Sequence, residues 1–294
     1  MSNNKIPGQN TRDSRETRDS RDSQSSRDSV EGLYALVTGG GSGIGLEIAK
    51  VLTLGGAHVT ICGRTQEKLK NAVTYLDEQL NDAEVSSGSV KYVVADITKE
   101  AEIAQALGFA ADPMGTLDIL VANAGGSSHI GSILNADQAQ VSETVSQNLI
   151  GTFLSIKHAV RYMSKSTNKA IVCITSGAGV FPHRFLWAYG MAKAGIESLV
   201  KSAAEEFGGL GVRVNSVAPG IIDDELMKPI TSGGRLLDDY LEQIPLSRIG
   251  TVSDVALAAK FLVGPESKWV TGTCVLVDGG HHLRRGANYE LLFS

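Results

Sequence analysis

The stretch LYALVTGGGSGIG, residues 33–45, decides the fold of this 294-residue chain. Residues 33–37 form an apolar run typical of a buried strand, and a glycine cluster follows directly. A helix is expected over residues 45–54, because Ile48 and Leu52 recur at the spacing of one helical face. A strand, a glycine-rich turn and a helix in this order form the first unit of a parallel α/β sheet.

The alternation of strand and helix continues along the chain. Further strands are expected at residues 58–62, 90–95, 117–121, 170–175, 212–217 and 274–277. Helices are expected at residues 65–80, 99–110, 138–163, 187–207 and 252–262, and, with breaks, at 223–243. The strands are continuous apolar runs, as in parallel sheets covered on both faces. The sequence therefore predicts an α/β protein with a single Rossmann-like, doubly wound domain, in which a seven-stranded, mostly parallel sheet has helices on both faces.

Residues 1–31 differ in composition from the rest of the chain. They are mostly Arg, Asp, Ser, Asn and Gln, and the tripeptide Arg-Asp-Ser begins at Arg12, Arg18, Arg21 and Arg27. Such a segment cannot offset its ordering entropy by burial, so we expect a disordered polar tail. The folded domain is expected to span residues 32–283, and residues 284–294 to form a C-terminal tail.

The composition argues against several classes of function. A formal net charge of −5 gives no electrostatic reason to expect a nucleic-acid partner. No apolar run approaches the roughly 18 residues of a membrane span, and no secretory signal is visible, so a cytoplasmic location is expected. Cys62, Cys173 and Cys274 have no metal-binding spacing, and the pair His281-His282 has no ligand partner in the sequence. We therefore expect no metal site.

The glycine cluster, residues 38–45, lies in the context that dinucleotide binding requires. Glycines allow a tight turn in which the backbone approaches a pyrophosphate, and the following helix N-terminus offers amides and a positive dipole. Glycine pairs alone are weak evidence, since any tight turn between a strand and a helix uses them. Because strand, turn and helix occur together here, we expect a dinucleotide cofactor.

The end of the second predicted strand indicates which dinucleotide. Folds that select NAD(H) usually place a carboxylate there, where it binds the hydroxyls of the adenosine ribose. This chain has Cys62-Gly63-Arg64-Thr65 instead, and a guanidinium binds a 2′-phosphate with paired donors. We therefore expect NADPH or NADP⁺ rather than NAD(H). The alternative is that Arg64 is a surface residue at the start of a helix.

A helical tyrosine and lysine and a serine at a strand end form a candidate catalytic set. Tyr189 and Lys193 are four residues apart on a predicted helix, so they lie on one face. An ammonium stabilises a phenolate, so we expect Lys193 to lower the pKa of Tyr189 and suit it for proton transfer. Ser176 closes the fifth predicted strand, where a hydroxyl would orient a substrate carbonyl. Taken alone, Ser176 could simply cap a turn, and a tyrosine and a lysine four residues apart could occur by chance.

The order of several motifs resembles that of the classical short-chain dehydrogenase/reductase family, over about residues 32–283. The matching motifs are TGGGSGIG at residues 38–45, Asp96-Ile97, Asn123-Ala124-Gly125, Asn148, Ser176, Tyr189 with Lys193, Pro219-Gly220 and Asp278-Gly279-Gly280. Each motif alone is unspecific, whereas the joint match in this order is highly specific. The resemblance implies that residues 32–283 form a catalytic oxidoreductase domain.

The resemblance also implies a mechanism. Tyr189 would give a proton to the carbonyl oxygen during reduction, Ser176 would hydrogen-bond that oxygen, and Lys193 would bind the nicotinamide ribose. Asn148 would hold a water of a proton relay that reaches Lys193. Family members usually assemble as homodimers or homotetramers. The implied cofactor-binding residues are Gly39, Gly41, Ser42, Gly43, Ile44, Arg64, Asp96, Ile97, Asn123, Gly125, Tyr189, Lys193, Pro219 and Ile222.

One position departs from the family's pattern. Asp224 stands where a threonine usually binds the carboxamide of the cofactor. An aspartate can still accept a hydrogen bond from the amide nitrogen, but it adds negative charge. The backbone of Ile222 is therefore expected to carry most of this anchoring.

The expected substrate is a small carbonyl compound or alcohol, and the walls of its site are expected to be apolar. They should come from residues 177–187 and from the residues after Gly220, namely Ile221, Ile222, Leu226, Met227 and Ile230. This favours a lipophilic ketone or alcohol over a sugar. Alternatively, some of the aromatic side chains face a second subunit. Of the two roles open to His183 in the site, contact with substrate is favoured over proton transfer, because Tyr189 already supplies the proton.

Two other functions fit the same fold. The first is a 3-oxoacyl carrier-protein reductase, which would dock its acidic partner through a basic residue such as Arg161. The acidic pair Glu205-Glu206 stands where such enzymes often carry an arginine, and it speaks against this function. The second is a non-catalytic NADPH-sensing or interaction protein. The complete set of Ser176, Tyr189 and Lys193 speaks against that alternative, since a sensor has no need of all three.

Overall fold

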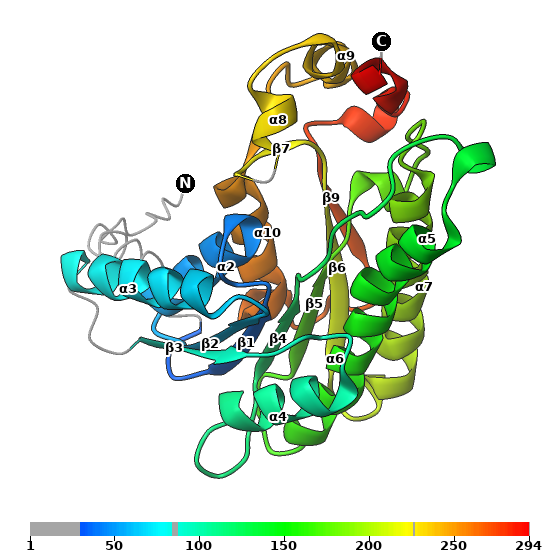
Figure 1. Ribbon diagram of the computed structural model, residues 1–294. Coiled ribbons are helices and arrows are strands. Elements are labelled where there is room, and N and C mark those ends of the chain that lie inside the picture. Colours follow the sequence, from blue (N-terminus) through cyan, green and yellow to red (C-terminus); the bar gives the residue numbers. More distant parts are fainter. Residues whose placement is uncertain (1–29, 84–87, 226, 294) are drawn as a thin grey trace, which may run out of the picture.

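The computed structural model of the protein describes residues 30–83, 88–225 and 227–293 (Figure 1). The predicted polar tail, residues 1–31, therefore lies almost entirely outside the described residues, as does Leu226. Among the residues described, no helix is both long and apolar enough to cross a membrane.

The centre of the molecule is a seven-stranded sheet in which every strand pair is parallel. The strand order is β3-β2-β1-β4-β5-β6-β9. The strands are β1 (Tyr34–Thr38), β2 (His58–Gly63), β3 (Ser89–Val94), β4 (Ile119–Ala122), β5 (Ala170–Ile174), β6 (Arg213–Pro219) and β9 (Cys274–Val277). This architecture confirms the predicted Rossmann-like α/β fold. The chain leaves β1 toward β2 and β3 on one side and continues with β4 on the other, which opens a crevice at the carboxyl ends of the strands.

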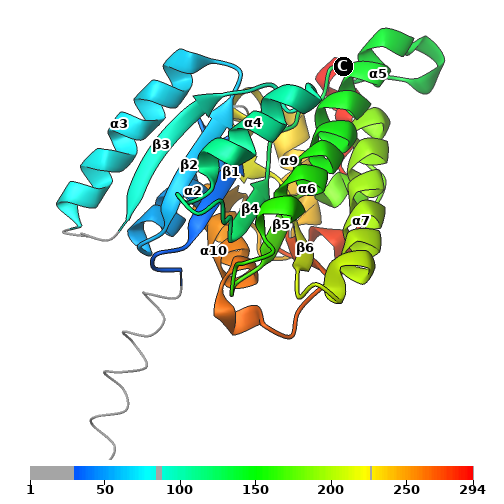
Figure 2. The ribbon, with the colours of Figure 1, turned by 90° about the horizontal axis from the view of Figure 1, so that it is seen from below.

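Helices cover both faces of the sheet (Figures 1 and 2). One face packs against α2 (Gly43–Leu54), α3 (Gln66–Asp82) and α10 (Val252–Val263). The other face packs against α4 (Glu100–Ala110), α6 (Gly151–Tyr162) and α7 (Trp187–Gly208). Apart from α6, these helices match the predicted ones to within a few residues at each end.

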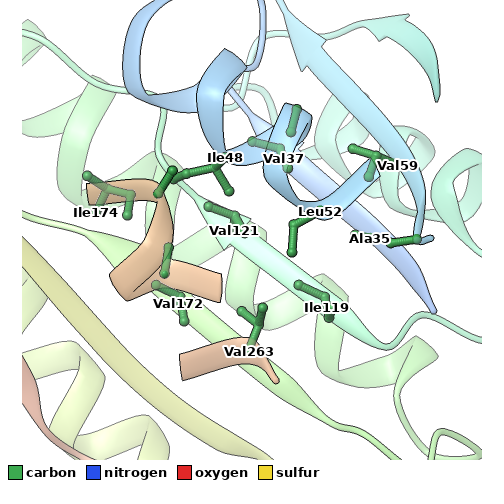
Figure 3. Packing of buried hydrophobic residues seen from close by; sticks show 14 of the residues in the cluster. Ala35, Val37, Ile48, Leu52, Val59, Ile119, Val121, Val172, Ile174 and Val263 are labelled. Carbon is green, nitrogen blue, oxygen red and sulfur yellow. The ribbon is translucent and has the colours of Figure 1, made fainter. Parts of the chain in front are cut away.

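The alternation of side chains along β1 feeds both layers. Ala35 and Val37 lie in the core shared with α2 and α10, which Figure 3 shows, and Leu36 lies in the core on the opposite face. All three residues are completely buried. Burial of a large aliphatic side chain such as Leu36 contributes about 1.5–3 kcal/mol to stability. These residues therefore stabilise the packing of the helices on both faces of the sheet.

The structure differs from the prediction at residues 138–163, which we expected to form one helix. It contains α5 (Gln138–Val145), a π-helical turn at Ser146–Ile150, and then α6. A π-helical turn contains one residue more than an α-helical turn but does not interrupt the run of apolar residues. The hydrophobic periodicity of the sequence therefore does not reveal it. The wider turn carries Asn148, one of the predicted site residues.

A second difference concerns residues 222–251. The two-residue strands β7 (Ile222–Asp223) and β8 (Gly250–Thr251) pair in parallel, and the short helices α8 (Lys228–Thr231) and α9 (Arg235–Gln243) lie between them. Gly233 and Gly234 have φ values of +132° and +102°, which separate α8 from α9. We expected only a broken helix here, since such a pairing depends on residues far apart in the sequence.

Residues 284–293, which we predicted as a tail, lie against the domain. Figure 1 shows this segment in red beside α9. It includes the 3-10 turn Tyr289–Phe293, which packs on α9. Tyr289 and Ala287 belong to the same buried cluster as Leu236 and Tyr240 of α9.

Candidate active site

A cavity of about 920 Å³ opens at the carboxyl ends of the strands. It extends from the glycine-rich turn after β1 to α9 and the C-terminal segment. Every predicted catalytic and cofactor-binding residue lines it except Asn148. The lining predicted residues are Gly39, Gly41, Ser42, Gly43, Ile44, Arg64, Asp96, Ile97, Asn123, Gly125, Ser176, Tyr189, Lys193, Pro219 and Ile222.

The glycine-rich turn has the shape of a phosphate cradle. Gly39 and Gly43 have φ values of +66° and +55°, a region that residues with a side chain rarely occupy. A Cβ atom at Gly45 would lie 2.3 Å from the carbonyl oxygen of Gly39, so no side chain fits there. The turn leads into the N-terminus of α2, whose first turn carries no acidic side chain. A pyrophosphate fits this arrangement of free amides and positive dipole.

Asn123 holds the turn against the neighbouring strand. Its side-chain amide donates to the carbonyl oxygens of Thr38, at 3.0 Å, and Gly39, at 3.3 Å. The hydroxyl oxygen of Thr38 accepts hydrogen bonds from the backbone amides of Asn123 and Ala124, at 3.0 and 3.1 Å. The carboxyl ends of β1 and β4 are thereby fixed relative to each other, and the cradle is rigid before any ligand arrives.

Arg64 and Asp96 mark the other end of the crevice, after β2 and β3. The carboxylate of Asp96 accepts hydrogen bonds from the backbone amide and the hydroxyl of Thr98, at 3.0 and 2.7 Å. Burial opposes its ionisation, but the bonds from Thr98 and the charge of Arg64 outweigh burial and lower the pKa of Asp96. Arg64 is exposed at the rim, so its guanidinium is accessible to an anionic group.

Tyr189 and Lys193 lie one turn apart on α7, as their spacing predicts. The ammonium nitrogen of Lys193 lies 5.4 Å from the centroid of the Tyr189 ring and donates to the carbonyl oxygen of Ile174, at 2.9 Å. Ser176, at the end of β5, is hydrogen-bonded to Tyr189 through its side chain. The structure therefore brings the serine, the tyrosine and the lysine together on one wall of the cavity.

The protonation equilibria of this pair run against one expectation. Burial raises the pKa of Tyr189 above its ordinary value, and the hydrogen bond from Ser176 only partly offsets it. We expected Lys193 to lower this pKa. Burial instead lowers the pKa of Lys193 itself to about 8, and its ammonium is directed at a backbone carbonyl. Desolvation is therefore the largest influence on the pKa of both groups.

Asn148 lies behind the cavity rather than in its wall. It is completely buried, and its side-chain amide donates to the carbonyl oxygens of Gly126, at 2.6 Å, and Thr144, at 2.7 Å. Its side-chain oxygen accepts from the amide of Gly126, at 3.3 Å. A Cβ atom at Gly125 would lie 2.3 Å from that oxygen and 3.3 Å from the Lys193 nitrogen. Only a glycine at this position lets the asparagine and the lysine approach.

Glu197 is a residue of the site that our sequence reasoning missed. It follows Lys193 by one turn of α7, and its carboxylate accepts hydrogen bonds from the hydroxyls of Thr175 and Ser216, the latter at 2.6 Å. The thiol of Cys274 lies 3.3 Å from the same carboxylate. Glu197 thus connects β6 and β9 to Thr175, the residue before Ser176. The spacing of four residues from Lys193 was the available signal.

Asp224 lies over the phosphate cradle. A Cβ atom at Gly43 would be 2.9 Å from a carboxylate oxygen of Asp224, and the other oxygen accepts from the amide of Met227, at 2.8 Å. The departure from the family's pattern therefore places a negative charge next to the turn that would hold a pyrophosphate. Like charges at such a distance repel each other.

The expected substrate walls divide between two cavities. Leu186, Ile221, Met227 and Ile230 line the cavity just described, together with His183. Other members of the expected wall line a neighbouring, more open groove of about 940 Å³: Phe181, Pro182, Arg184, Phe185 and Trp187. His183 lines both cavities, and burial lowers its pKa to about 4, so it is neutral at physiological pH.

The cavity is also lined by aromatic residues that we did not expect there. Tyr240 of α9, His281 and Tyr289 line it. The ring centroids are 5.4 Å apart for Tyr240 and His281, and 6.2 Å apart for Tyr240 and Tyr289. The hydroxyl oxygens of Tyr240 and Tyr289 are 2.9 Å apart. No sequence motif connects these residues, because they come from separate segments.

Comparison with known proteins agrees with this geometry. A family model described as enoyl-(acyl carrier protein) reductase matches residues 39–282. A 3-oxoacyl-(acyl-carrier-protein) reductase of Chlamydia muridarum is 34% identical over 247 residues, which cover 84% of this chain and 96% of that protein. A short-chain type dehydrogenase/reductase structure from Mycobacterium ulcerans is 40% identical, covers 89% of this chain and 94% of that one, and has a TM-score of 0.85.

A further structure bears on the cofactor. It is a short chain dehydrogenase from Burkholderia cenocepacia in complex with NADP, 28% identical, with a TM-score of 0.77, and it covers 86% of this chain and 98% of its own. The family match covers the glycine turn, the catalytic set and the crevice between them. The chain therefore belongs to the short-chain dehydrogenase/reductase family of oxidoreductases.

Proposed function

We propose that this protein is an NADP(H)-dependent oxidoreductase that interconverts a carbonyl compound and an alcohol, with a lipophilic substrate. One observation carries the proposal. Ser176, Tyr189 and Lys193 line the same cavity as the glycine-rich turn and Arg64. A dinucleotide that spans this cavity would therefore place its reactive end beside the three side chains.

The raised pKa of Tyr189 supports the role of a proton donor. A buried phenol stays protonated at neutral pH, which is the form that gives a proton to a carbonyl oxygen during reduction. The hydroxyl of Ser176, which is hydrogen-bonded to Tyr189, would hold the same oxygen in place. Lys193 would supply positive charge at the site and hold the ribose end of the cofactor. Asn148 would keep Gly125 and Gly126 in register behind the lysine.

NADPH fits the residues at the start of α2 and after β2. The backbone amides at the start of α2 would bind the pyrophosphate, and Arg64 would pair with the 2′-phosphate of the adenosine ribose. The structural relative from Burkholderia cenocepacia was solved with NADP, which supports this choice. When bound, the cofactor supplies or accepts the hydride, and the side chains supply the orientation and the proton.

The wall opposite Tyr189 is apolar and favours a lipophilic substrate. Ile221, Leu186 and Ala178 are each at most 8% exposed and form one cluster with Tyr240 of α9 and Tyr289. A sugar would leave several hydroxyls without partners against these side chains.

A carrier-linked acyl substrate is a second candidate, favoured by the Chlamydia relative and by the description of the family model. Arg161 lies in the last turn of α6 and is exposed, as docking of an acidic carrier protein requires. Glu205 and Glu206 are also exposed on α7 and would repel such a partner. We therefore place the free lipophilic carbonyl first.

We also propose a homodimer or homotetramer. Ile150, Phe153 and Met191 are more than 40% exposed, although they are large and apolar, and they lie on the neighbouring helical segments around α6 and α7. Burial of these side chains against a second copy would be favourable. Light scattering of the full chain tests this, and a monomer at micromolar concentration would contradict it.

Loss of NADPH absorbance tests the proposed activity. Aliphatic and aromatic ketones, sugars, quinones and acyl thioesters, free and carrier-linked, would be tried with NADPH and with NADH in parallel. Turnover of a ketone that falls about 10²–10⁴-fold in Tyr189→Phe would support the reductase. Tyr162→Phe, which removes a hydroxyl outside the cavity, is the matched control. Tight NADPH binding without turnover in either direction would favour the sensor instead.

A further inference from the structure

The C-terminal segment, residues 284–293, closes the substrate end of the cavity. Tyr289 is only 4% exposed, and Leu292 is partly exposed, yet both line the cavity that contains Tyr189. The match to the family model ends at residue 282, so this segment follows the matched region.

Ion pairs and backbone contacts hold the segment in place on α9. Both carboxylate oxygens of Asp239 are engaged: Arg285 donates to each of them, and the backbone amide of Asn288 donates to one, at 2.8 Å. Asp239 is 9% exposed, so its charge is matched by a partner rather than by water. The segment is therefore fixed to α9 and is not a loose tail.

A second set of contacts fixes the segment on the loop that follows Ser176. The amide of Tyr289 donates to the carbonyl oxygen of Arg184, at 3.2 Å, and the side chain of Arg184 pairs with Glu290, at 2.8 Å. A Cβ atom at Gly286 would lie 1.9 Å from the carbonyl oxygen of Pro182, so the two backbones are in close contact there. Tyr289 is thus held from two sides with little freedom to leave the wall.

The hydroxyl of Tyr289 meets that of Tyr240 at 2.9 Å, and both residues line the cavity. Each hydroxyl has one O–H group, and the hydrogen bond between the two tyrosines uses only one of these donors. The other O–H group of the pair can therefore donate to a ligand. Among the residues that the structure describes, no second hydrogen-bond partner is seen for either hydroxyl. Tyr189 packs against the same cluster, so the hydroxyl pair and Tyr189 line the same part of the cavity.

We propose that residues 284–293 complete the substrate site and that the Tyr240–Tyr289 pair binds a second oxygen atom of the substrate. This rests on the proposed function and names its substrate class: a lipophilic carbonyl compound with a further carbonyl, hydroxyl or ether oxygen a short distance from the reacting carbon. The apolar wall holds the carbon chain, and the hydroxyl pair holds the second oxygen. Tyr289 is then a specificity-determining residue, and Asp239 and Arg285 are positioning residues.

Matched ketones test the proposal. An unbranched aliphatic monoketone would be compared with diketones of the same length, whose second carbonyl is adjacent or separated by one or two carbons. For the unaltered protein, at least one diketone is expected to have the lower KM. One hydrogen bond supports a preference of about threefold to tenfold. Tyr289→Phe is expected to lose that preference through a larger rise in KM for the diketone than for the monoketone.

Tyr240→Phe is expected to weaken the preference as well, and Tyr162→Phe, outside the cavity, to leave it unchanged. Asp239→Asn is expected to raise KM for the diketone more than for the monoketone, because the wall that carries Tyr289 loosens. A preference that survives in Tyr289→Phe, or an equal loss on all ketones, would overturn the proposal.

Calorimetric binding of the same ketones to the protein with NADP⁺ separates this proposal from the proposed function. Tighter binding of a diketone that disappears in Tyr289→Phe would support the site even if no ketone is reduced, and the reductase alone would then fail. Equal binding of monoketone and diketones by the unaltered protein, or no binding of any of them, would overturn the site. Reduction without any preference would leave the reductase standing and remove the role of Tyr289.

Discussion

The two ends of the cavity are built in different ways. The phosphate cradle at the cofactor end is made by consecutive residues, since the turn after β1 forms it by itself and Asn123 locks it to the next strand. The substrate end is assembled from the loop after β5, α9, the turn after β9 and the C-terminal segment. Backbone geometry defines the first end, and side-chain pairs such as Asp239–Arg285 define the second. We therefore expect the cradle to tolerate no side chain at Gly45 and the substrate end to accept changes that alter specificity.

The largest effect should come from Gly45→Ala. The new methyl group would lie 2.3 Å from the Gly39 carbonyl oxygen and 2.5 Å from the Asn123 amide, so the backbone of the cradle has to move. We expect NADPH affinity, measured by fluorescence titration, to fall more than 100-fold, since misplaced amides lose several hydrogen bonds. Gly208→Ala, where a Cβ meets nothing within 4 Å, should bind normally. Unimpaired binding by Gly45→Ala would show that the cradle is not rigid.

Arg64→Gln sharpens the comparison within the cofactor end. Loss of a charge-assisted contact to the 2′-phosphate should weaken NADPH binding by about 10- to 100-fold and leave NADH binding unchanged. The ratio of the two dissociation constants is the measurement. Lys68→Gln, which also removes a positive charge from the cavity lining, is the matched control. An equal loss for both cofactors would mean that Arg64 does not contact that phosphate.

The pH profile tests whether burial sets the charge of the catalytic lysine. Burial lowers the pKa of Lys193 to about 8, so its ammonium is complete below that pH and is lost as the pH rises through it. If reduction requires the ammonium, kcat/KM should fall about tenfold per pH unit above pH 8. If Lys193 had the pKa of an exposed lysine, kcat/KM would begin to fall only above pH 10. A flat profile to pH 10, with the fold intact by circular dichroism, would contradict the expectation.

The smallest effect is expected for Asp224→Asn. The amide keeps the shape and the bond from Met227 but removes a negative charge beside Gly43. NADPH should bind several-fold more tightly, and the gain should shrink at high salt, because screening weakens the repulsion. Asp223→Asn is the control, since that carboxylate is exposed and paired with Lys228. Weaker binding by Asp224→Asn would instead show that the carboxylate accepts a hydrogen bond from the cofactor.

Most of the fold was predictable because it repeats one local pattern. Buried parallel strands read as apolar runs, and the helices between them show a clear apolar face, so all seven strands of the sheet were expected within two residues at each end. The elements that escaped prediction depend on distant contacts. The spacing of apolar residues along the sequence does not reveal three features: the pairing of β7 with β8, the π-helical turn around Asn148, and the docking of residues 284–293.

The candidate site shows the same division. Residues in compact motifs, such as Gly39, Ser176 and Lys193, were named from the sequence and line the cavity. Glu197 left a spacing signal that we did not use. The direction of the Tyr189 pKa was wrong, because spacing along a helix reveals the neighbouring lysine but not the desolvation of both groups.

By itself, the sequence determined the sheet, the cofactor cradle and the set of Ser176, Tyr189 and Lys193. Short-range sterics and helical spacing suffice for these features, since glycine turns and residues four apart act locally. Only the tertiary structure decided how far each group is desolvated and which side chains face Tyr189 across the cavity. Burial and the meeting of Tyr240 with Tyr289 depend on segments 49 residues apart, and these come together only when the whole core has packed.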